Sequence, residues 1–237
     1  MVSVEEVLSQ LESKSKPDKL QGMARYGINI QNRLGVSIPE LRKMAKTIGK
    51  DHGLAARLWR TGIADARILA AMIEDPEMLD EKQMENWVKD INSWDVGDQV
   101  CMNLFEKSHL AWKKVDDWSR REEEFVKRTA FGLLACLAWH DKNAKDEKFT
   151  KLFPVFARGA LDERNSVKKA VSWALRNIGK RNSNLNRAAL SEANTILMLY
   201  SRSARWIARD VIRELKSDAV QKRLKKKQQI EPKKSAI

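Results

Sequence analysis

Trp94 and Asp98 are the residues of this chain whose types and spacing most clearly suggest chemistry. A helix turns by about 100° per residue, so residues four apart lie about 40° apart on its surface. The apolar residues of the same segment, Val96, Val100 and Leu104, fall on nearly the opposite side. An indole and a carboxylate therefore face outward together. There the indole could lie against a sugar or a base, and the carboxylate could stabilise a developing positive charge.

Asp95 lies close by and could suggest a pair of carboxylates. At an offset of three residues, however, it lies some 60° from Asp98 around the helix. As a residue of the first turn it better serves the helix N-terminus, where a negative charge is favourable. We therefore expect Asp98 alone to carry the chemistry.

Three later segments also place cations or tryptophans away from their apolar side. They present Lys169, Trp173, Arg176 and Lys180 in 167–180, Arg128 beside Gly132 and Ala135 in 126–139, and Arg202, Trp206, Arg209 and Arg213 near the C-terminus. A charged face taken alone is usually only solvated, and a tryptophan outside the apolar stripe often packs on a neighbouring helix layer. The agreement of these faces with one another and with the net charge favours a shared binding function.

The chain is strongly basic, with 45 Lys and Arg against 32 Asp and Glu and a formal net charge of +13. Such a balance favours an anionic partner. A nucleic-acid groove explains both components of the faces, because cations neutralise phosphates and indoles stack on sugars or bases. A membrane surface would prefer an apolar face flanked by lysines, so it is the weaker interpretation.

Other classes of chemistry lack their sequence signals. The three histidines are scattered without further ligands at metal-binding spacing, and no phosphate-binding or dinucleotide-binding glycine loop is present, so we expect no metal and no cofactor. Cys101 and Cys136 form no disulfide framework, which favours a reducing compartment. The apolar run 130–139 is too short to span a bilayer. The N-terminal residues lack a signal peptide, so we expect a cytoplasmic protein.

The apolar residues recur with helical spacing through nearly the whole chain, which predicts an all-α protein of roughly ten to twelve helices. Ser37 and Glu40 predict a capping box with Pro39 in the first turn. Comparable alanine-rich helices centre near Ala70, Val100, Ala130, Ala170 and Ala208.

This spacing of roughly 30 to 40 residues is typical of an α-solenoid of stacked HEAT-like or armadillo-like helix pairs, whose concave face would here be basic. We expect one repeat domain over 1–217, and an irregular helical bundle is the alternative. The lysine-rich composition of 218–237 predicts a fraying helix end and a disordered basic tail.

Five ordered motifs resemble a known family. They are Met23–Tyr26, Gly35–Glu40, Trp94–Asp98, Val126–Arg128 and Lys169–Arg176. Together they are similar to the AlkD-like alkylpurine DNA glycosylases, proteins of HEAT-like repeats that remove alkylated bases. The resemblance extends to about residue 215.

The resemblance implies a role for several residues. Asp98 would be the catalytic carboxylate, Trp94 and Trp173 would hold the backbone of the lesion nucleotide, and Arg128 would contact a phosphate. Tyr26 matches a tyrosine near the DNA path. Some members have a tryptophan where this chain has Ser93, so we expect looser packing there.

These roles suit one reaction. A purine alkylated at N3 or N7 is cationic and leaves as a neutral base, so no general acid is needed. Asp98 could stabilise the oxocarbenium-like sugar and position a water. We therefore expect a monomeric, monofunctional glycosylase acting on alkylated purines in double-stranded DNA, with Lys169, Arg176, Lys180, Arg209 and Arg213 contacting DNA. The resemblance further implies that the lesion does not enter a deep base pocket.

Two alternatives remain at the level of sequence. A non-catalytic DNA-binding or damage-sensing repeat protein would use the same tryptophans and arginines. A helical scaffold for an acidic protein would bind DNA no more strongly than its charge predicts. Asp98 separates the first alternative from the enzyme, because a carboxylate in a phosphate-binding groove repels the ligand.

Overall fold

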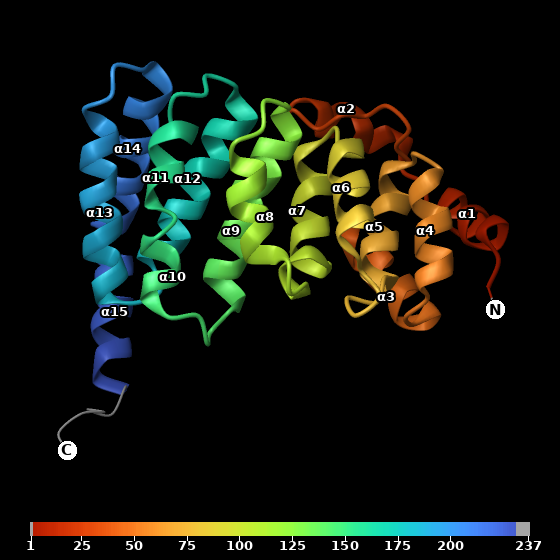
Figure 1. The fold of residues 1–237 in the computed structure, drawn as a ribbon. Helices are drawn as coiled ribbons and strands as arrows, with labels where there is room; N and C mark the ends of the chain where they lie inside the picture. Colours follow the sequence, from red (N-terminus) through yellow and green to blue (C-terminus); the bar gives the residue numbers. More distant parts are fainter. Residues whose placement is uncertain (1, 231–237) are drawn as a thin grey trace. The chain divides into compact units, whose positions relative to one another are not determined.

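The part of the chain that the computed structural model describes, residues 2–230, is built of helices and contains no strand (Figure 1). The chain divides into two compact units, Met1–Ala111 and a second that begins at Trp112. The predicted repeat domain over 1–217 thus spans both units. No helix within 2–230 is both long and apolar enough to cross a membrane.

The first unit contains seven α-helices and two short 3₁₀ segments. They are α1 (Val4–Ser13), η1 (Pro17–Lys19), α2 (Leu20–Ala24), α3 (Ile38–Ile48), α4 (His52–Arg60), α5 (Ala64–Ile73), α6 (Glu81–Asp90), α7 (Trp94–Asn103) and η2 (Phe105–Lys107). The core of this unit is α5, which contacts α3, α4 and α7. Its sequence is apolar on nearly every side, and most of its residues are buried.

The start of α3 is placed as predicted, but its cap differs. Ser37 is the N-cap residue in an extended conformation and Pro39 lies in the first turn. The Ser37 side chain makes no capping hydrogen bond. Glu40 instead binds Lys43 at 2.8 Å and Lys14 at 3.5 Å. The predicted capping box is therefore wrong, because two nearby ammonium groups hold the glutamate.

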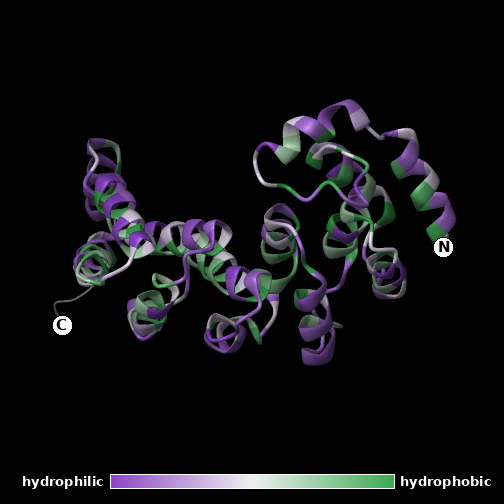
Figure 2. Cartoon of the chain, turned by 90° about the horizontal axis from the view of Figure 1, so that it is seen from above, coloured by the Kyte–Doolittle hydropathy of each residue, from purple (hydrophilic) through white to green (hydrophobic). Residues whose placement is uncertain are grey.

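The second unit begins within α8 and continues to the last described residue. Its helices are α8 (Ala111–Ser119), α9 (Glu124–His140), α10 (Asp146–Thr150), α11 (Phe153–Gly159), α12 (Asn165–Gly179), α13 (Ser183–Leu197), α14 (Arg202–Leu215) and α15 (Asp218–Ile230). The centre of this unit is α12, which packs against α9, α13 and α14. Hydrophobic residues line the sides on which neighbouring helices meet (Figure 2).

The predicted repeat centres all lie in α-helices. Ala70 is in α5, Val100 in α7, Ala130 in α9, Ala170 in α12 and Ala208 in α14. Their side chains are buried, as the helical spacing predicts. The all-α helical-repeat prediction is confirmed. The described residues form fifteen α-helices, which is more than the ten to twelve predicted.

The basic segment that was predicted to be a disordered tail forms α15 as far as Ile230. Val220 and Leu224, one turn apart, are buried. The Gln221 amide donates a hydrogen bond to the Leu215 carbonyl at 2.6 Å. The lysines of this segment lie mostly on its exposed sides, so they do not prevent packing. The predicted lack of packed structure from Glu231 onward lies outside the described residues.

Candidate nucleic-acid interface

The start of α7 presents Trp94 and Asp98 together on a half-buried side of the helix. Val96, Val100 and Cys101 occupy the buried side, so the predicted outward placement is confirmed. The Trp94 indole N–H donates a hydrogen bond to the Tyr26 carbonyl at 3.1 Å. The Tyr26 side chain is 77% exposed. The fold therefore brings together two predicted site residues that are 68 positions apart.

An ion pair fixes the first turn of α7. The Arg33 guanidinium donates to both carboxylate oxygens of Asp95, at 2.7 and 3.0 Å. The Arg33 Nε also donates to the Asn29 carbonyl at 3.0 Å. Since the Arg33 side chain is only 2% exposed, Asp95 is engaged in an almost dry contact.

Ser93 completes the same network. Its hydroxyl donates to Asp95 at 2.5 Å and accepts the backbone N–H of Asn29 at 3.1 Å. The residue is 1% exposed. The prediction of looser packing at Ser93 is therefore wrong, since the small hydroxyl is bonded on both sides where an indole could not fit in the same way.

A buried acid that the sequence pattern did not reveal shapes the loop before α3. Asp65 is 1% exposed, and its carboxylate accepts the backbone N–H groups of Leu34 at 2.7 Å and Val36 at 2.8 Å. Between them Gly35 has a φ of +78°, and a Cβ there would lie 2.8 Å from the Lys16 carbonyl oxygen. A lone aspartate within the apolar segment Ile63–Ala66 was the available signal.

In the second unit, some residues of the predicted binding face of α12 are accessible and others are held in ion pairs. Trp173 is half-buried and Lys169 is exposed. Arg176 lies 3.3 Å from Asp210 and also pairs with Glu214, and Lys180 lies 2.7 Å from Glu214. The last two cations are thus held by acids of α14, whereas Lys169 faces solvent.

The ion pairs with Arg176 and Lys180 lower the pKa of Glu214. Burial raises the pKa of Glu214, but hydrogen bonds from Lys180 and Arg176 outweigh it and leave the pKa below its ordinary value. Glu214 is therefore a stable anion that joins α12 to α14.

The exposed side of α14 carries a more open cationic surface. Arg202, Arg205, Trp206, Arg209, Asp210 and Arg213 line a pocket of 330 Å³. Trp206 is 41% exposed, and the Lys168 ammonium lies 5.1 Å from its ring centroid. Arg213 pairs with Asp210. An indole among arginines is suited to stacking and phosphate contact.

Arg128 is buried, whereas the sequence predicts that it faces outward. The segment of α9 from Arg128 to Ala138, including Gly132 and Ala135, is buried. Arg128 itself is 5% exposed. The prediction of an outward face on α9 is wrong, because this helix is apolar or small on nearly every side.

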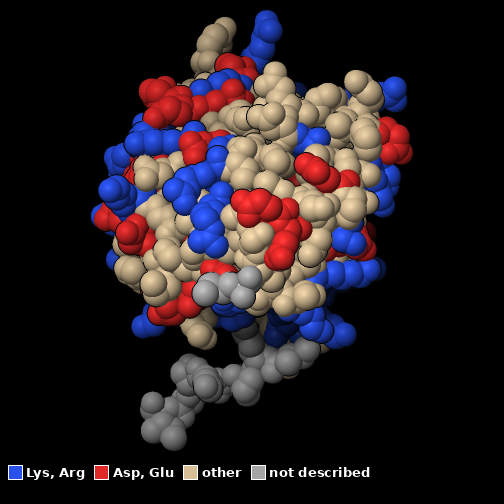
Figure 3. Space-filling view, turned by 90° about the vertical axis from the view of Figure 1, so that its right-hand side faces the viewer, with Lys and Arg blue, Asp and Glu red and all other residues tan. Residues whose placement is uncertain are grey.

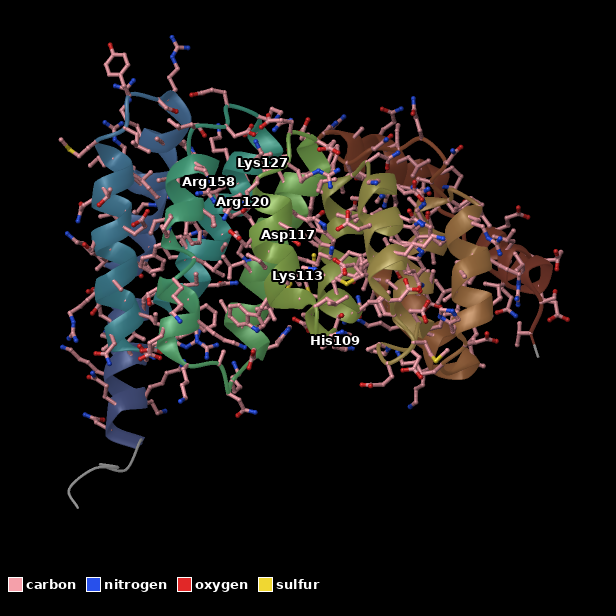
Figure 4. The ribbon with its side chains drawn as sticks, viewed as in Figure 1. His109, Lys113, Asp117, Arg120, Lys127 and Arg158 are labelled. Atoms are coloured by element: carbon pink, nitrogen blue, oxygen red, sulfur yellow. The ribbon has the colours of Figure 1, made fainter. Side chains whose placement is uncertain are left out.

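Other surfaces mix both signs of charge. On the face over α1 and α4, Lys and Arg are interspersed with Asp and Glu (Figure 3). Lys113 and Asp117 lie on α8, and Arg120 comes directly after its end (Figure 4). Arg120 pairs there with Asp116 at 2.8 Å. Within residues 2–230 no group of three or more His, Cys, Asp or Glu side chains could hold a metal ion.

A solved structure with a TM-score of 0.74 supports the helical-repeat fold. One match is described as a new family of proteins related to the HEAT-like repeat DNA glycosylases with affinity for branched DNA structures; it has a TM-score of 0.74 and 18% identity over 90% of this chain and 95% of that chain. A designed armadillo repeat protein in complex with a (KR)4 peptide has a TM-score of 0.33 and 17% identity over 78% of this chain and 79% of that one.

No curated protein matches the sequence. The family model described as DNA alkylation repair enzyme matches residues 7–215. That range holds every predicted site residue and all of the helices from α3 to α14. The chain belongs to the DNA alkylation repair enzyme family.

Proposed function

We propose that this protein is a monofunctional DNA glycosylase that hydrolyses the N-glycosidic bond of cationic N3- and N7-alkylated purines in duplex DNA. The observation that carries the proposal is the pair of Asp98 and Trp94, one turn apart on the half-buried side of α7. Membership of the DNA alkylation repair enzyme family supports it.

The proposed reaction needs one carboxylate from the protein and no general acid. As the bond from C1′ to the base nitrogen breaks, its electron pair neutralises the positive charge of the alkylated purine, so the base leaves without a proton. The sugar becomes an oxocarbenium-like cation, which the Asp98 carboxylate stabilises. A water bonded to the same carboxylate adds to C1′ and gives its proton to that carboxylate, which then releases it to solvent. Electrostatic stabilisation of this kind commonly contributes more to the rate of an enzyme than any other single effect.

The other site residues bind DNA in this proposal. In the first unit, Trp94 holds the backbone of the lesion nucleotide and Tyr26 lies along the DNA path. In the second unit, Trp173 is a further indole that contacts the DNA backbone. Phosphates are contacted by Lys169, Arg176, Lys180, Arg209 and Arg213, and Arg128 is left out of this set because it is buried on α9. Arg176 and Lys180 would exchange a carboxylate partner for a phosphate. The protein acts as a monomer in the cytoplasm, associated with the nucleoid when bound to DNA, and the lesion stays outside any deep base pocket.

The test is release of 7-methylguanine from methylated duplex DNA by the wild type and by Asp98→Asn. We expect release by the wild type and a loss of about 10²- to 10³-fold in rate for the variant, the range seen when one transition-state-stabilising group is removed. Asp18→Asn, which removes an exposed carboxylate on η1, is the matched control and should keep the wild-type rate.

Two outcomes would contradict the proposal. Equal rates for the wild type and Asp98→Asn would remove Asp98 from the reaction. A wild type that binds the methylated duplex but releases no base would overturn the glycosylase assignment for this lesion.

The second candidate is a non-catalytic DNA-binding protein. It is favoured by the solved structure with a TM-score of 0.74, whose family has affinity for branched DNA structures. For such a protein Asp98→Asn should strengthen DNA binding, because it removes a negative charge near phosphates. Base release by the wild type separates the two candidates, because a non-catalytic protein releases no base.

A further inference from the structure

A pocket of 310 Å³ lies within the second unit, between the C-terminal ends of α9 and α12 and the helix α15. Two indoles, Trp139 and Trp173, line it together with five cations, and among the described residues no acidic side chain is part of its lining. Its volume is at the small end of ligand pockets, which range from about 300 to 1,000 Å³. It can hold a unit of nucleotide size, and a paired duplex is too wide to enter it.

The helix α15 supplies two of the cations. Arg223 and Lys227 are one turn apart and flank the buried Leu224. The Lys227 ammonium donates to the carbonyls of Arg181 at 2.9 Å and Lys180 at 3.3 Å. These contacts tie α15 to the end of α12, while Arg223 remains exposed. The pocket is therefore built partly from the segment that composition alone marks as a loose tail.

Arg181 brings a positive charge to the pocket. Its hydrogen bonds go to neutral carbonyl groups and so do not neutralise this charge. Its guanidinium donates to the carbonyls of Ala138 at 2.8 Å and Ala144 at 3.1 Å, and it lies 4.4 Å from the Phe149 ring centroid. Its Nε is buried without a hydrogen-bond partner within the described structure. A buried donor in this state is costly unless something accepts from it, and an anion in the pocket could do so directly or through a water.

The indoles give the pocket its apolar surface. Trp139 is 52% exposed, and the His140 ring stacks on it with centroids 4.8 Å apart. Trp173 is half-buried on α12. Asn177, also in the lining, donates its amide N–H to the Ala135 carbonyl at 3.2 Å. Its amide oxygen can therefore still accept from a ligand.

We propose that this pocket binds one unpaired nucleotide of DNA, with the base against Trp139 and the phosphate against Arg223 and Arg181. Aromatic rings beside a run of cations are the combination with which proteins hold unpaired nucleotides. DNA is chosen as the nucleic acid because the chain belongs to a DNA repair family. This site goes beyond the proposed base excision, and its binding requires no bond to break.

The experiment compares two fluorescent probes at one salt concentration, a fully paired duplex and the same duplex with one unpaired thymidine. We expect the wild type to bind the second probe at least about tenfold more tightly, the scale of one base stacked on an aromatic ring. Trp139→Ala should remove most of this preference, and Trp139→Phe should restore it. Arg223→Ala should weaken binding of the second probe more than Lys222→Ala, which removes the same charge from an exposed position on α15 that does not line the pocket.

Equal binding of the two probes by the wild type would overturn the proposal. A preference that survives both Trp139→Ala and Arg223→Ala, in variants that melt like the wild type, would overturn it as well. Base release is measured separately on methylated duplex. Its absence would contradict the glycosylase and would leave the ratio of the two binding constants unchanged, so the two failures are distinguishable.

Discussion

At the scale of single residues, Asp95 and Asp98 are two aspartates three positions apart on α7. Asp95 faces an arginine whose side chain is 2% exposed, and it also accepts a hydrogen bond from Ser93. Asp98 lies one turn from Trp94 on the half-buried side of α7. The first aspartate fixes the helix start, whereas the second lies beside the indole that the proposed chemistry uses.

Asp95→Asn should destabilise the protein strongly. Removing one partner of a buried ion pair leaves the other charge without compensation, which typically costs about 3–5 kcal/mol. The free energy of unfolding, measured with urea, checks this value. Asp116→Asn is the control, because it breaks a pair with Arg120 in which the side chains are 42% and 58% exposed. An exposed pair contributes only about 0–1 kcal/mol, so similar losses for both variants would contradict our assignment.

At the scale of helices, close approach in the second unit depends on a missing side chain. Gly159 ends α11, and a Cβ there would lie 2.4 Å from Phe131 Cζ and 3.1 Å from Val171 Cγ2. Phe131 belongs to α9 and Val171 to α12, so this glycine lets three helices meet. The aromatic ring it touches is fully buried and has little room to move.

Gly159→Ala should therefore destabilise the protein by about 1–3 kcal/mol, as overpacking of a filled core does. Gly22→Ala in α2 is the matched control, since nothing lies within 4 Å of the added Cβ. It should stabilise the protein by about 0.5–1 kcal/mol through the better helix propensity of alanine. Thermal or urea unfolding of both variants measures the difference, and equal shifts in the same direction would show that the α9–α11–α12 contact is not tight.

At the scale of the whole molecule, the net charge of +13 means that cations outnumber acids. An acid that pairs with two cations therefore reduces the repulsion between them. Asp162 lies before α12 with its side chain 7% exposed, within 3.2 Å of Lys127 and 2.5 Å of Arg164. Burial raises the pKa of Asp162, but hydrogen bonds from Arg164 and Lys127 outweigh it and lower the pKa from 3.8 to about 2. Together with Glu214 it holds cations of the second unit in place.

This lowered pKa predicts how stability depends on pH. An acid with a folded pKa below its unfolded value stabilises the fold fully above the unfolded pKa, and the contribution is lost as pH falls toward the folded pKa. Asp162→Asn should thus cost roughly 1–2 kcal/mol at pH 7, and the difference from wild type should shrink between about pH 4 and pH 2. Unfolding free energies across that range provide the measurement. A deficit that stays constant down to pH 2 would show that the charge of Asp162 is not its cause.

Local sequence was enough to predict the helices, their repeated spacing and the outward placement of Trp94 and Asp98 on α7. These features depend on which side chains lie three and four positions apart, and this periodicity is local. The packing of α15 was also available in principle, from Val220 and Leu224 one turn apart. The prediction of a disordered tail instead rests on the lysine-rich composition of the segment.

Which charges meet was settled by the tertiary fold. Arg33 and Asp95 are 62 positions apart, Arg176 and Glu214 are 38 apart, and no local pattern pairs them. The burial of Arg128 likewise depends on α9 being packed on sides that its own periodicity left open. Helix formation depends on neighbouring residues in the sequence, whereas ion pairing and burial depend on contacts between distant segments. For this reason the sequence predicts that Arg176 and Lys180 are accessible, although in the fold both are paired with acids.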